Sequence, residues 1–308
     1  MKNFTINDVK GVIPAMITTF DENENVDFKK AEIVIEDLIL KGADALYITG
    51  STGEGFLMSL EERKAFAECV MDVTAGRIPV VIHIGAIGTK MSIDLAKHAE
   101  KIGAAAISSV PPFYYGYSNE DIFNYYKDIS DSVSLPMIVY NIKLAGLMNK
   151  DLIRQLATIE HVNGLKFTSR EHDEMSALKI ELGPDFMIYS GCDEMATQGL
   201  LAGADGIIGS TYNLMCDTFK EIYILAKEGK YVEAFEIQKV ATAVTYNLLK
   251  SDFFPTLKAC MRKMGIDAGY SRKPFIEPSD KKIQEIFDGI KSLSSYKRAD
   301  SITLMKYL

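Results

Sequence analysis

Short apolar segments alternate with amphipathic segments along most of the chain. Each apolar segment is bounded by Gly, Pro or polar residues, which is typical of a buried strand. In residues 28–40 apolar side chains recur at helical spacing and Lys41-Gly42 ends the pattern, so we predict a helix there. The alternation repeats, and we expect eight strands, at 11–17, 44–49, 79–85, 104–110, 137–141, 162–167, 186–190 and 205–209.

A predicted helix follows every predicted strand. The helix that begins after Ser59 starts with a capping-box pattern, because Glu62 stands at the position from which its carboxylate can reach back to the Ser. The remaining helices of this series are expected at 92–102, 119–130, 150–158, 171–181, 193–201 and 215–227.

Strict alternation of strand and helix implies parallel strands joined by helical crossovers. Eight such units within residues 1–229 predict an α/β fold, the (β/α)₈ or TIM barrel. A doubly wound open sheet could be built from the same elements. However, no Gly-x-Gly-x-x-Gly fingerprint follows the first predicted strand, which argues against the nucleotide-binding form of that sheet.

The pattern changes after residue 229, where no further strands are predicted. Three more helices are expected, at 231–249, 255–264 and 279–293. Because no linker rich in Gly, Ser or Pro precedes them, we expect residues 230–308 to form a helical appendage packed on the barrel or on a neighbouring subunit. The segment after Ser294 is polar and is expected to fray.

Composition and charge argue against several classes of protein. The 308 residues are 47% hydrophobic and carry a formal net charge of −8 without a basic stripe, so we expect no nucleic-acid partner. The N-terminus has no signal-peptide apolar region, and no apolar run approaches the length of a membrane span. None of the four cysteines has CxxC spacing, so reduced thiols are expected. Together these features predict a cytoplasmic protein without a membrane partner.

Polar side chains gather where the predicted strands end. In a barrel of this kind the active site lies at the carboxyl ends of the strands, so these side chains are expected on one rim. In chain order they are Ser51, Thr52, Tyr114, Tyr115, Tyr140, Lys166, Gly191, Asp193, Glu194, Ser210 and Tyr212.

Lys166 is the candidate nucleophile of this rim. A lysine among apolar side chains loses its proton more easily and can then form an imine with a carbonyl substrate. The alternative is a lysine whose stem lies on apolar surface while its ammonium reaches water.

Imine chemistry needs partners that the same rim offers. The Tyr140 phenol is suited to relay protons. A 2-oxo acid also needs donors for its carboxylate, and Ser51 and Thr52 supply hydroxyls and backbone N–H groups just before a helix. Residues 50–55 could instead be only a flexible turn that opens that helix.

Other chemistries find less support in the sequence. The four histidines show no metal-ligand spacing, and His83 is expected to pack inside the barrel. Asp193 and Glu194 could be two metal carboxylates, although an acidic pair at a helix start is the commoner meaning of this pattern. Tyr114 and Tyr115 could form a packed aromatic loop or part of a subunit interface. We expect neither a metal nor an organic cofactor.

Four motifs in combination resemble a known family. They are Gly50-Ser51-Thr52-Gly53-Glu54, Phe113-Tyr114-Tyr115, Val139-Tyr140-Asn141 and Gly164-Leu165-Lys166. Over nearly its whole length the chain resembles the pyruvate-dependent class I aldolases of the dihydrodipicolinate synthase and N-acetylneuraminate lyase group.

The resemblance implies a fold, an assembly and an activity. The fold would be a barrel with three C-terminal helices, usually assembled as a homotetramer. Lys166 would form a Schiff base with pyruvate, and Tyr140 would relay protons together with Ser51. In this family a tyrosine of the aromatic pair reaches the proton relay of a neighbouring subunit; here that would be Tyr115 or, in second place, Tyr114.

Residues 191–194, Gly-Cys-Asp-Glu, favour the lyase branch of this family. They resemble a lyase motif that holds the polyhydroxylated chain of sialic acid. Thr168 and Ser210 stand in segments that also resemble the lyases, and both would lie near the bound substrate. The resemblance therefore implies reversible cleavage of sialic acid to N-acetylmannosamine and pyruvate.

The loop after the fifth strand separates this chain from both branches. The synthase branch carries an Arg shortly after its Tyr-Asn pair, whereas no Arg stands between Asn141 and Arg154. The lyases usually have Pro where Lys143 stands. Two alternatives therefore remain: another pyruvate aldolase, such as the synthase or a sugar-acid aldolase, and a non-catalytic relative that binds a 2-oxo acid.

Overall fold

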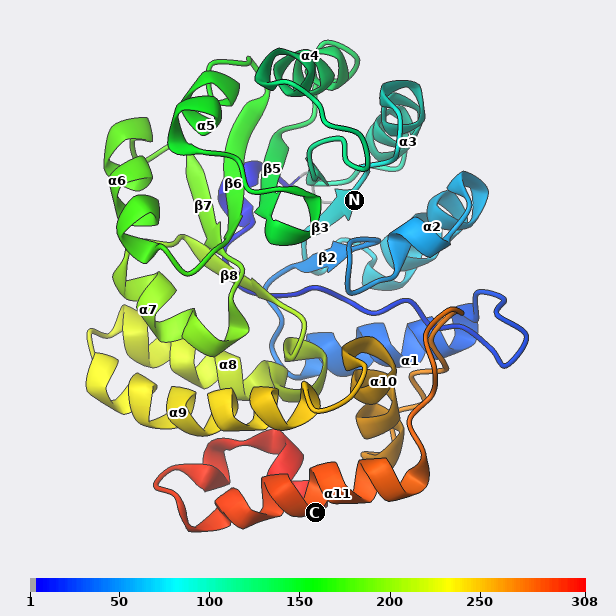
Figure 1. Cartoon of the computed structure of the whole chain (residues 1–308), viewed down its shortest axis with the longest axis vertical. Helices are drawn as coiled ribbons and strands as arrows, with labels where there is room; N and C mark the ends of the chain where they lie inside the picture. The colour runs from blue at the N-terminus through cyan, green and yellow to red at the C-terminus, as the bar shows by residue number, and fades with distance from the viewer. Residues whose placement is uncertain (1–3) are drawn as a thin grey trace.

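Eight parallel strands form the centre of the molecule. In the computed structural model, which describes residues 4–308, they lie in the order β1-β8-β7-β6-β5-β4-β3-β2, so neighbours in the chain are neighbours in the sheet (Figure 1). A parallel bridge between Ala15 and Tyr47 joins β1 to β2 and closes the ring. The TIM barrel predicted from the alternation is thus confirmed. The strands are β1 (Gly11–Pro14), β2 (Leu46–Ile48), β3 (Val80–His83), β4 (Ala106–Ser109), β5 (Met137–Ile142), β6 (Val162–Thr168), β7 (Met187–Ser190) and β8 (Gly206–Gly209).

Several strands are shorter than the apolar segments that predicted them. Residues 15–17, for example, are buried, but the N–H of Ile17 donates to the Asn213 side chain (3.2 Å) instead of to a neighbouring strand. An apolar run reports burial, whereas a strand ends where its backbone groups find other partners. The two boundaries therefore need not coincide.

Helices surround the strands on the outside of the barrel (Figure 1). The capping box at Ser59 is present: the N–H of Ser59 donates to Glu62 (2.8 Å), and the N–H of Glu62 donates to Ser59 Oγ (3.2 Å). The helices of this layer are α1 (Phe28–Leu40), α2 (Leu60–Thr74), α3 (Thr89–Lys101), α4 (Asn119–Ser130), α5 (Lys150–Leu156), α6 (His172–Leu182), α7 (Ala196–Leu201) and α8 (Tyr212–Lys227).

Helix α3 starts at Thr89, three residues before the predicted position, and two further helices also differ from the prediction. The segment 193–201 is divided into a 3₁₀ turn, Asp193–Met195, and the separate helix α7. The carbonyl of Asp193 accepts a hydrogen bond from the Gln238 side chain (3.0 Å), so it does not continue a regular helical ladder. Helix α8 starts earlier than residue 215, and Met215 is the site of a kink within it.

Three more helices follow the barrel, as expected: α9 (Tyr231–Leu248), α10 (Phe253–Lys263) and α11 (Asp280–Lys291). Figure 1 shows α9 alongside α8, and α11 on the side of α9 that faces away from the barrel. The apolar faces of these helices belong to the same hydrophobic core as the barrel helices. They therefore pack on their own chain, and the division at residues 229 and 230 remains a proposal.

The segment after Ser294 packs against α8, so the expectation that it frays is wrong. Ile302 and Leu304 are 0% exposed, and the N–H of Thr303 donates to Thr218 Oγ1 (3.1 Å) on α8. The segment is polar in average composition, but its few apolar side chains join the hydrophobic core. The burial of these few side chains holds the segment in place, and average composition does not reveal it.

We expect Ile302→Ala to lower the free energy of unfolding by about 2–4 kcal/mol, because the removed groups leave a cavity in the core. Denaturant titration of the full chain measures this change. The control is Tyr307→Ala, at a half-exposed position of the same segment, for which we expect a change below about 0.5 kcal/mol. Equal free energies of unfolding in the two variants would contradict the docking of this segment.

The described part of the chain contains neither a membrane-spanning helix nor a disulfide. No helix within residues 4–308 is long and apolar enough to cross a membrane. The four cysteines at positions 69, 192, 216 and 260 are free thiols.

Candidate active site

Lys166 lies on β6 with its side chain buried inside the barrel. In the sheet it pairs with Tyr140 on β5 and with Tyr189 on β7. The residue is 4% exposed, and its Nζ lies 4.1 Å from the ring centroid of Tyr140 and 4.3 Å from that of Tyr47. The alternative in which the ammonium extends into water is therefore wrong.

The surroundings of Lys166 favour its neutral amine. Burial lowers the pKa of Lys166 to about 7, and the nearby Asp193 carboxylate partly opposes this shift. Near neutral pH a large fraction of the side chain is therefore unprotonated. A neutral, buried amine can attack a carbonyl carbon.

Tyr140 lies beside this amine, and the hydroxyl groups of Thr168 and Ser51 lie next to its phenol. Burial raises the pKa of its phenol, while the hydroxyls of Thr168 and Ser51 act in the opposite direction. Thr168 Oγ1 itself is buried and has no well-aligned hydrogen-bond partner within residues 4–308. Lys166, Tyr140, Ser51 and Thr168 therefore form one cluster.

Ser51 and Thr52 belong to a tight turn that is closed by a backbone hydrogen bond. The N–H of Gly55 donates to Gly50 O (3.1 Å), and a Cβ on Gly55 would lie 2.0 Å from Thr49 O, so only glycine fits. Thr52 Oγ1 is hydrogen bonded to Ser210 Oγ (2.7 Å), which links the loop after β2 to the loop after β8.

The expected helix does not directly follow Ser51 and Thr52. A short 3₁₀ turn, Gly55–Leu57, comes first, and α2 begins only at Leu60. The donors that the two residues offer to a carboxylate are therefore their own hydroxyls and the N–H groups of the tight turn, not the N-terminus of an α-helix.

Gly191, Asp193 and Glu194 lie at the end of β7, on the side of the barrel next to Thr168. A Cβ on Gly191 would lie 2.0 Å from Thr168 Oγ1, so the glycine permits this close approach. Asp193 accepts hydrogen bonds from the backbone N–H and the hydroxyl of Thr211, both at 2.7 Å. Burial raises the pKa of Asp193 to about 6, against the effect of these two donors.

Glu194 is more accessible than Asp193 and pairs with Arg170 (3.4 Å) at the rim. Across residues 4–308 no group of three or more His, Cys, Asp and Glu side chains is arranged to hold a metal ion.

Tyr114 and Tyr115 lie apart from the cluster around Lys166. Tyr115 is 67% exposed and Tyr114 is 82% exposed, and the two rings stack edge to face at 5.1 Å. Among the described contacts of Tyr115 are those with Tyr114 and Tyr117, and none with Lys166 or Tyr140 is found within residues 4–308.

Two further residues, His83 and Tyr47, pack beside Lys166 and Tyr140 and were not predicted to do so. His83 packs inside the barrel as expected, but its ring also lies 6.2 Å from the ring of Tyr140. Tyr47 contacts the lysine from β2, and its hydroxyl donates to Ser108 Oγ (3.0 Å). Both stand within apolar strand segments, where no polar pattern marks them as part of a site.

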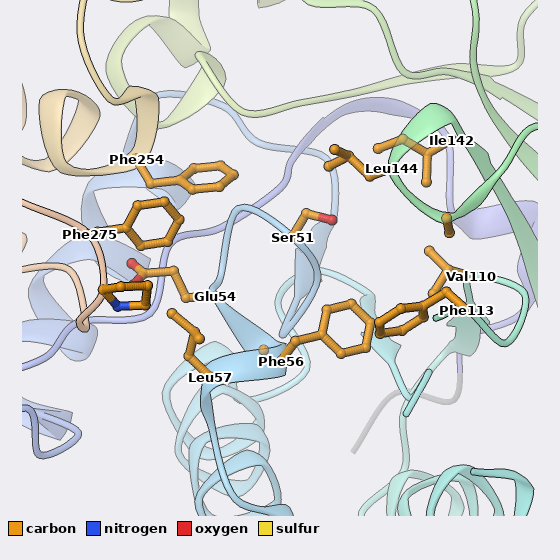
Figure 2. A pocket seen from close by; sticks show the side chains of 13 residues that line it. Ser51, Glu54, Phe56, Leu57, Val110, Phe113, Ile142, Leu144, Phe254 and Phe275 are labelled. Carbon is orange, nitrogen blue, oxygen red and sulfur yellow. The ribbon is translucent and has the colours of Figure 1, made fainter. Parts of the chain in front are cut away.

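A largely apolar cavity of about 340 Å³ opens beside Ser51. Figure 2 shows Phe56 and Phe113 on one side of it and Phe254 and Phe275 on another. The loop that contains Lys143 contributes Ile142, Leu144 and Ala145 to its wall. The cavity therefore lies at the mouth of the barrel, between the loops after β2, β4 and β5 and the C-terminal region.

A comparison with known families assigns this barrel to one of them. Residues 8–293 match the model of the Dihydrodipicolinate synthetase family. The chain belongs to this family. It is accordingly a class I pyruvate aldolase, as the resemblance implied.

Relatives within the family come from both of its branches. The N-acetylneuraminate lyase of Citrobacter koseri is 37% identical over 283 residues, which cover 91% of this chain and 95% of that protein. A catalytic lysine mutant of the Ruminococcus gnavus sialic acid aldolase aligns with a TM-score of 0.91 at 27% identity, covering 99% of this chain and 100% of that one. A dihydrodipicolinate synthase from Bacillus anthracis aligns with a TM-score of 0.88, also at 27% identity, covering 92% and 98%.

Proposed function

We propose that this chain is an N-acetylneuraminate lyase, which cleaves sialic acid reversibly to N-acetylmannosamine and pyruvate through a Schiff base on Lys166. The observation that carries the proposal is the buried Lys166 amine 4.1 Å from the Tyr140 ring, beside polar groups at the ends of β6, β7 and β8. The similarity to a lyase of the same name and to a sialic acid aldolase with a catalytic lysine supports it.

The first step forms the imine. The neutral Lys166 amine attacks the C2 ketone of open-chain sialic acid, and the carbinolamine takes up one proton and loses water to give a protonated imine. Ser51 and Thr52 bind the neighbouring carboxylate with hydroxyl and backbone donors. This binding holds C2 next to the lysine and orients the substrate for cleavage.

The second step breaks the C3–C4 bond. Burial keeps the Tyr140 phenol protonated, so its oxygen takes the proton of the C4 hydroxyl while its own proton passes to the substrate carboxylate. C4 becomes the aldehyde carbon of N-acetylmannosamine. The electron pair of the broken bond moves into the protonated imine and gives an enamine. Protonation at C3 and hydrolysis of the imine then release pyruvate and restore the Lys166 amine.

The part of the substrate that leaves as N-acetylmannosamine lies next to polar residues. Thr168, Gly191, Asp193, Glu194 and Ser210 bind the polyhydroxylated chain of the sugar, for which carboxylates, hydroxyls and a close backbone are suitable partners. Thr211 donates two hydrogen bonds to Asp193 Oδ2, and these bonds fix the orientation of the carboxylate.

Assembly completes the proposed site. We propose a homotetramer in the cytoplasm in which Tyr115 of one subunit joins the proton relay of a neighbour. The exposure of Tyr114 and Tyr115 is consistent with this role, since large aromatic side chains at such positions favour an interface.

A synthase-type aldolase is the second candidate. The structural similarity to the Bacillus anthracis synthase favours it. The absence of an Arg between Asn141 and Arg154 counts against it, because the carboxylate of aspartate semialdehyde would lack that partner.

A product assay separates the two candidates. The purified protein is incubated with N-acetylneuraminate and, in parallel, with pyruvate plus aspartate semialdehyde, and the products are identified by mass spectrometry. We expect pyruvate and N-acetylmannosamine from the first reaction. Turnover in the second reaction alone would replace the lyase by the synthase, and pyruvate binding without turnover in either would indicate a non-catalytic relative.

The rate of imine formation is expected to rise with pH through a midpoint near pH 7. Only the neutral amine attacks, and the pKa of Lys166 is about 7, so the rate falls below that pH and levels off above it. Borohydride trapping of pyruvate over a pH series measures the midpoint, and thermal unfolding at each pH serves as the control. A midpoint near about 10.4, the ordinary lysine value, would contradict the prediction.

A further inference from the structure

The two loops that carry the proposed substrate-binding groups are both held by the C-terminal helices. Residues 50–57 carry Ser51 and Thr52, and residues 191–195 carry Asp193 and Glu194. Helix α10 contacts the first loop through a buried ion pair, and α9 contacts the second through a buried amide. Helix α9 also packs directly against α7 and α8 (Figure 1). The helices thus support the site although they contribute no strand to the barrel.

The ion pair joins Glu54, in the first loop, to Lys258 on α10. Lys258 Nζ donates to Glu54 Oε1 (2.5 Å) and to Tyr270 O (2.7 Å), and both charged side chains are 0% exposed. The second carboxylate oxygen of Glu54 accepts the backbone N–H of Arg272 (2.8 Å). Both oxygens of Glu54 are therefore bound by the C-terminal region.

Because Glu54 belongs to the same turn as Ser51 and Thr52, its contacts with the C-terminal region also restrict the positions of these two residues. Glu54 has a φ of 53°, which is unusual for a residue with a side chain, and its N–H donates to Ser51 O (3.1 Å). Arg272 secures the far end of the same loop, because its guanidinium donates to Leu57 O (2.8 Å). The C-terminal region therefore binds this loop at two places, at Glu54 in its turn and at Leu57 at its end.

The energetics of the ion pair point to position and not to stability. A buried ion pair is often no more stable than an apolar pair of similar volume, because both charges lose their hydration. A role in holding one geometry explains why charges stand at these positions. The geometry they hold is that of the turn that carries Ser51 and Thr52.

Gln238 on α9 plays the corresponding part for the second loop. It is 1% exposed, its Nε2 donates to Asp193 O (3.0 Å), and its Oε1 accepts the backbone N–H of Thr197 (3.1 Å). Its second amide hydrogen goes to Thr242 Oγ1 (3.1 Å), which donates in turn to Glu194 O (3.1 Å). The backbone carbonyls of both acidic residues are therefore bound by α9.

We propose that Lys258 and Gln238 are positioning residues with separate targets. Lys258 positions the loop that binds the carboxylate of the 2-oxo acid, and Gln238 positions the loop that binds the sugar. Neither side chain contacts the reacting atoms; each acts through residues that do. The sugar half of this inference rests on the proposed function, and the 2-oxo acid half requires only that pyruvate binds at Lys166.

The test uses Lys258→Met and Gln238→Leu in the full chain, because both substitutions keep side-chain size while removing the polar contacts. Two quantities are measured for each variant. The first is the pyruvate concentration that gives half-maximal borohydride trapping on Lys166, quantified by mass spectrometry of the intact protein. The second is the KM for N-acetylmannosamine in condensation with saturating pyruvate.

We expect opposite patterns in the two variants. Lys258→Met raises the half-saturating pyruvate concentration by about tenfold, as expected for a misplaced charge-assisted contact, and changes the KM for N-acetylmannosamine little. Gln238→Leu raises the KM for N-acetylmannosamine by about tenfold and leaves pyruvate trapping unchanged. The matched control is Lys179→Met, which breaks the Lys179–Asp205 ion pair at the amino end of β8 and should change neither constant.

Equal shifts of both constants in the two variants, or shifts no larger than those of Lys179→Met, would overturn the proposal. If Lys258→Met does not fold, the double variant Glu54→Gln with Lys258→Met removes both buried charges and takes its place. For Gln238, Thr242→Val is the milder substitute.

The proposed function and this inference fail in different ways. A wild-type protein that does not trap pyruvate contradicts the proposed function. A wild-type protein that traps pyruvate but does not condense it with N-acetylmannosamine contradicts the lyase assignment but not pyruvate binding at Lys166. In that case the difference between Lys258→Met and Gln238→Leu in pyruvate trapping still decides the role of Lys258, and aspartate semialdehyde replaces the sugar as acceptor for Gln238.

Discussion

Replacement of Lys166 by Met is expected to lower the rate of N-acetylneuraminate cleavage by about 10⁵-fold. The amine is the nucleophile of the proposed reaction, and no other lysine shares its buried position between Tyr47 and Tyr140 among residues 4–308. Without the imine, the electron pair of the C3–C4 bond has no acceptor. Activity is measured by pyruvate release, and the covalent adduct by borohydride trapping with pyruvate, which should disappear in the variant.

The fold should survive this substitution. Met is apolar and similar in length, and it removes an amine whose burial disfavours its charged form. We therefore expect a thermal unfolding temperature equal to or above that of the wild type. Lys179→Met, outside the site, should keep both cleavage and trapping. An adduct of unchanged yield in Lys166→Met, with activity intact, would exclude Lys166 as the nucleophile.

The barrel could be predicted from the sequence because its signal is repeated. Apolar segments followed by amphipathic ones recur eight times, and crossover connections between parallel strands leave few arrangements for such a chain. The ends of elements carry no such repetition. Ile17 is apolar and buried but its N–H bonds to Asn213, and the segment after Ser294 is polar overall but buries Ile302. In both cases a tertiary contact overrides the local pattern.

The candidate site could be predicted in part, for a geometric reason. Ser51, Tyr140, Lys166 and Asp193 follow or end parallel strands, and the carboxyl ends of such strands meet on one rim. Their burial and their mutual distances could not be obtained in this way. The sequence also gives no sign of which face of a doubly buried strand points inward, so Tyr47 was missed.

The contacts that support the site are harder to predict from the sequence than the site residues themselves. Lys258 stands on an amphipathic helix, and its partner Glu54 lies 204 residues earlier in the chain. Neither residue differs in type or spacing from an ordinary solvated charge. Only the packing of α10 against the loop after β2 turns the two side chains into a buried ion pair.

Removal of one oxygen atom, in Tyr140→Phe, is expected to lower the kcat for cleavage by about 10²–10⁴-fold. In the proposed mechanism the phenol relays the proton of the C4 hydroxyl to the substrate carboxylate, and Phe keeps the ring against Lys166 but cannot relay a proton. Imine formation with saturating pyruvate should remain detectable by borohydride trapping, because the amine is unchanged. The two steps of the reaction are thereby separated in one variant.

The control for this variant is Tyr189→Phe, which removes the oxygen of another buried tyrosine on a strand next to β6. Its hydroxyl donates to Val9 O (3.0 Å), away from Ser51 and Thr168, so only stability should fall, by about 1 kcal/mol. Equal losses of kcat in Tyr140→Phe and Tyr189→Phe would indicate a packing effect and contradict the proton relay. A loss confined to Tyr140→Phe, with trapping retained, can arise only if the phenol acts after the imine has formed.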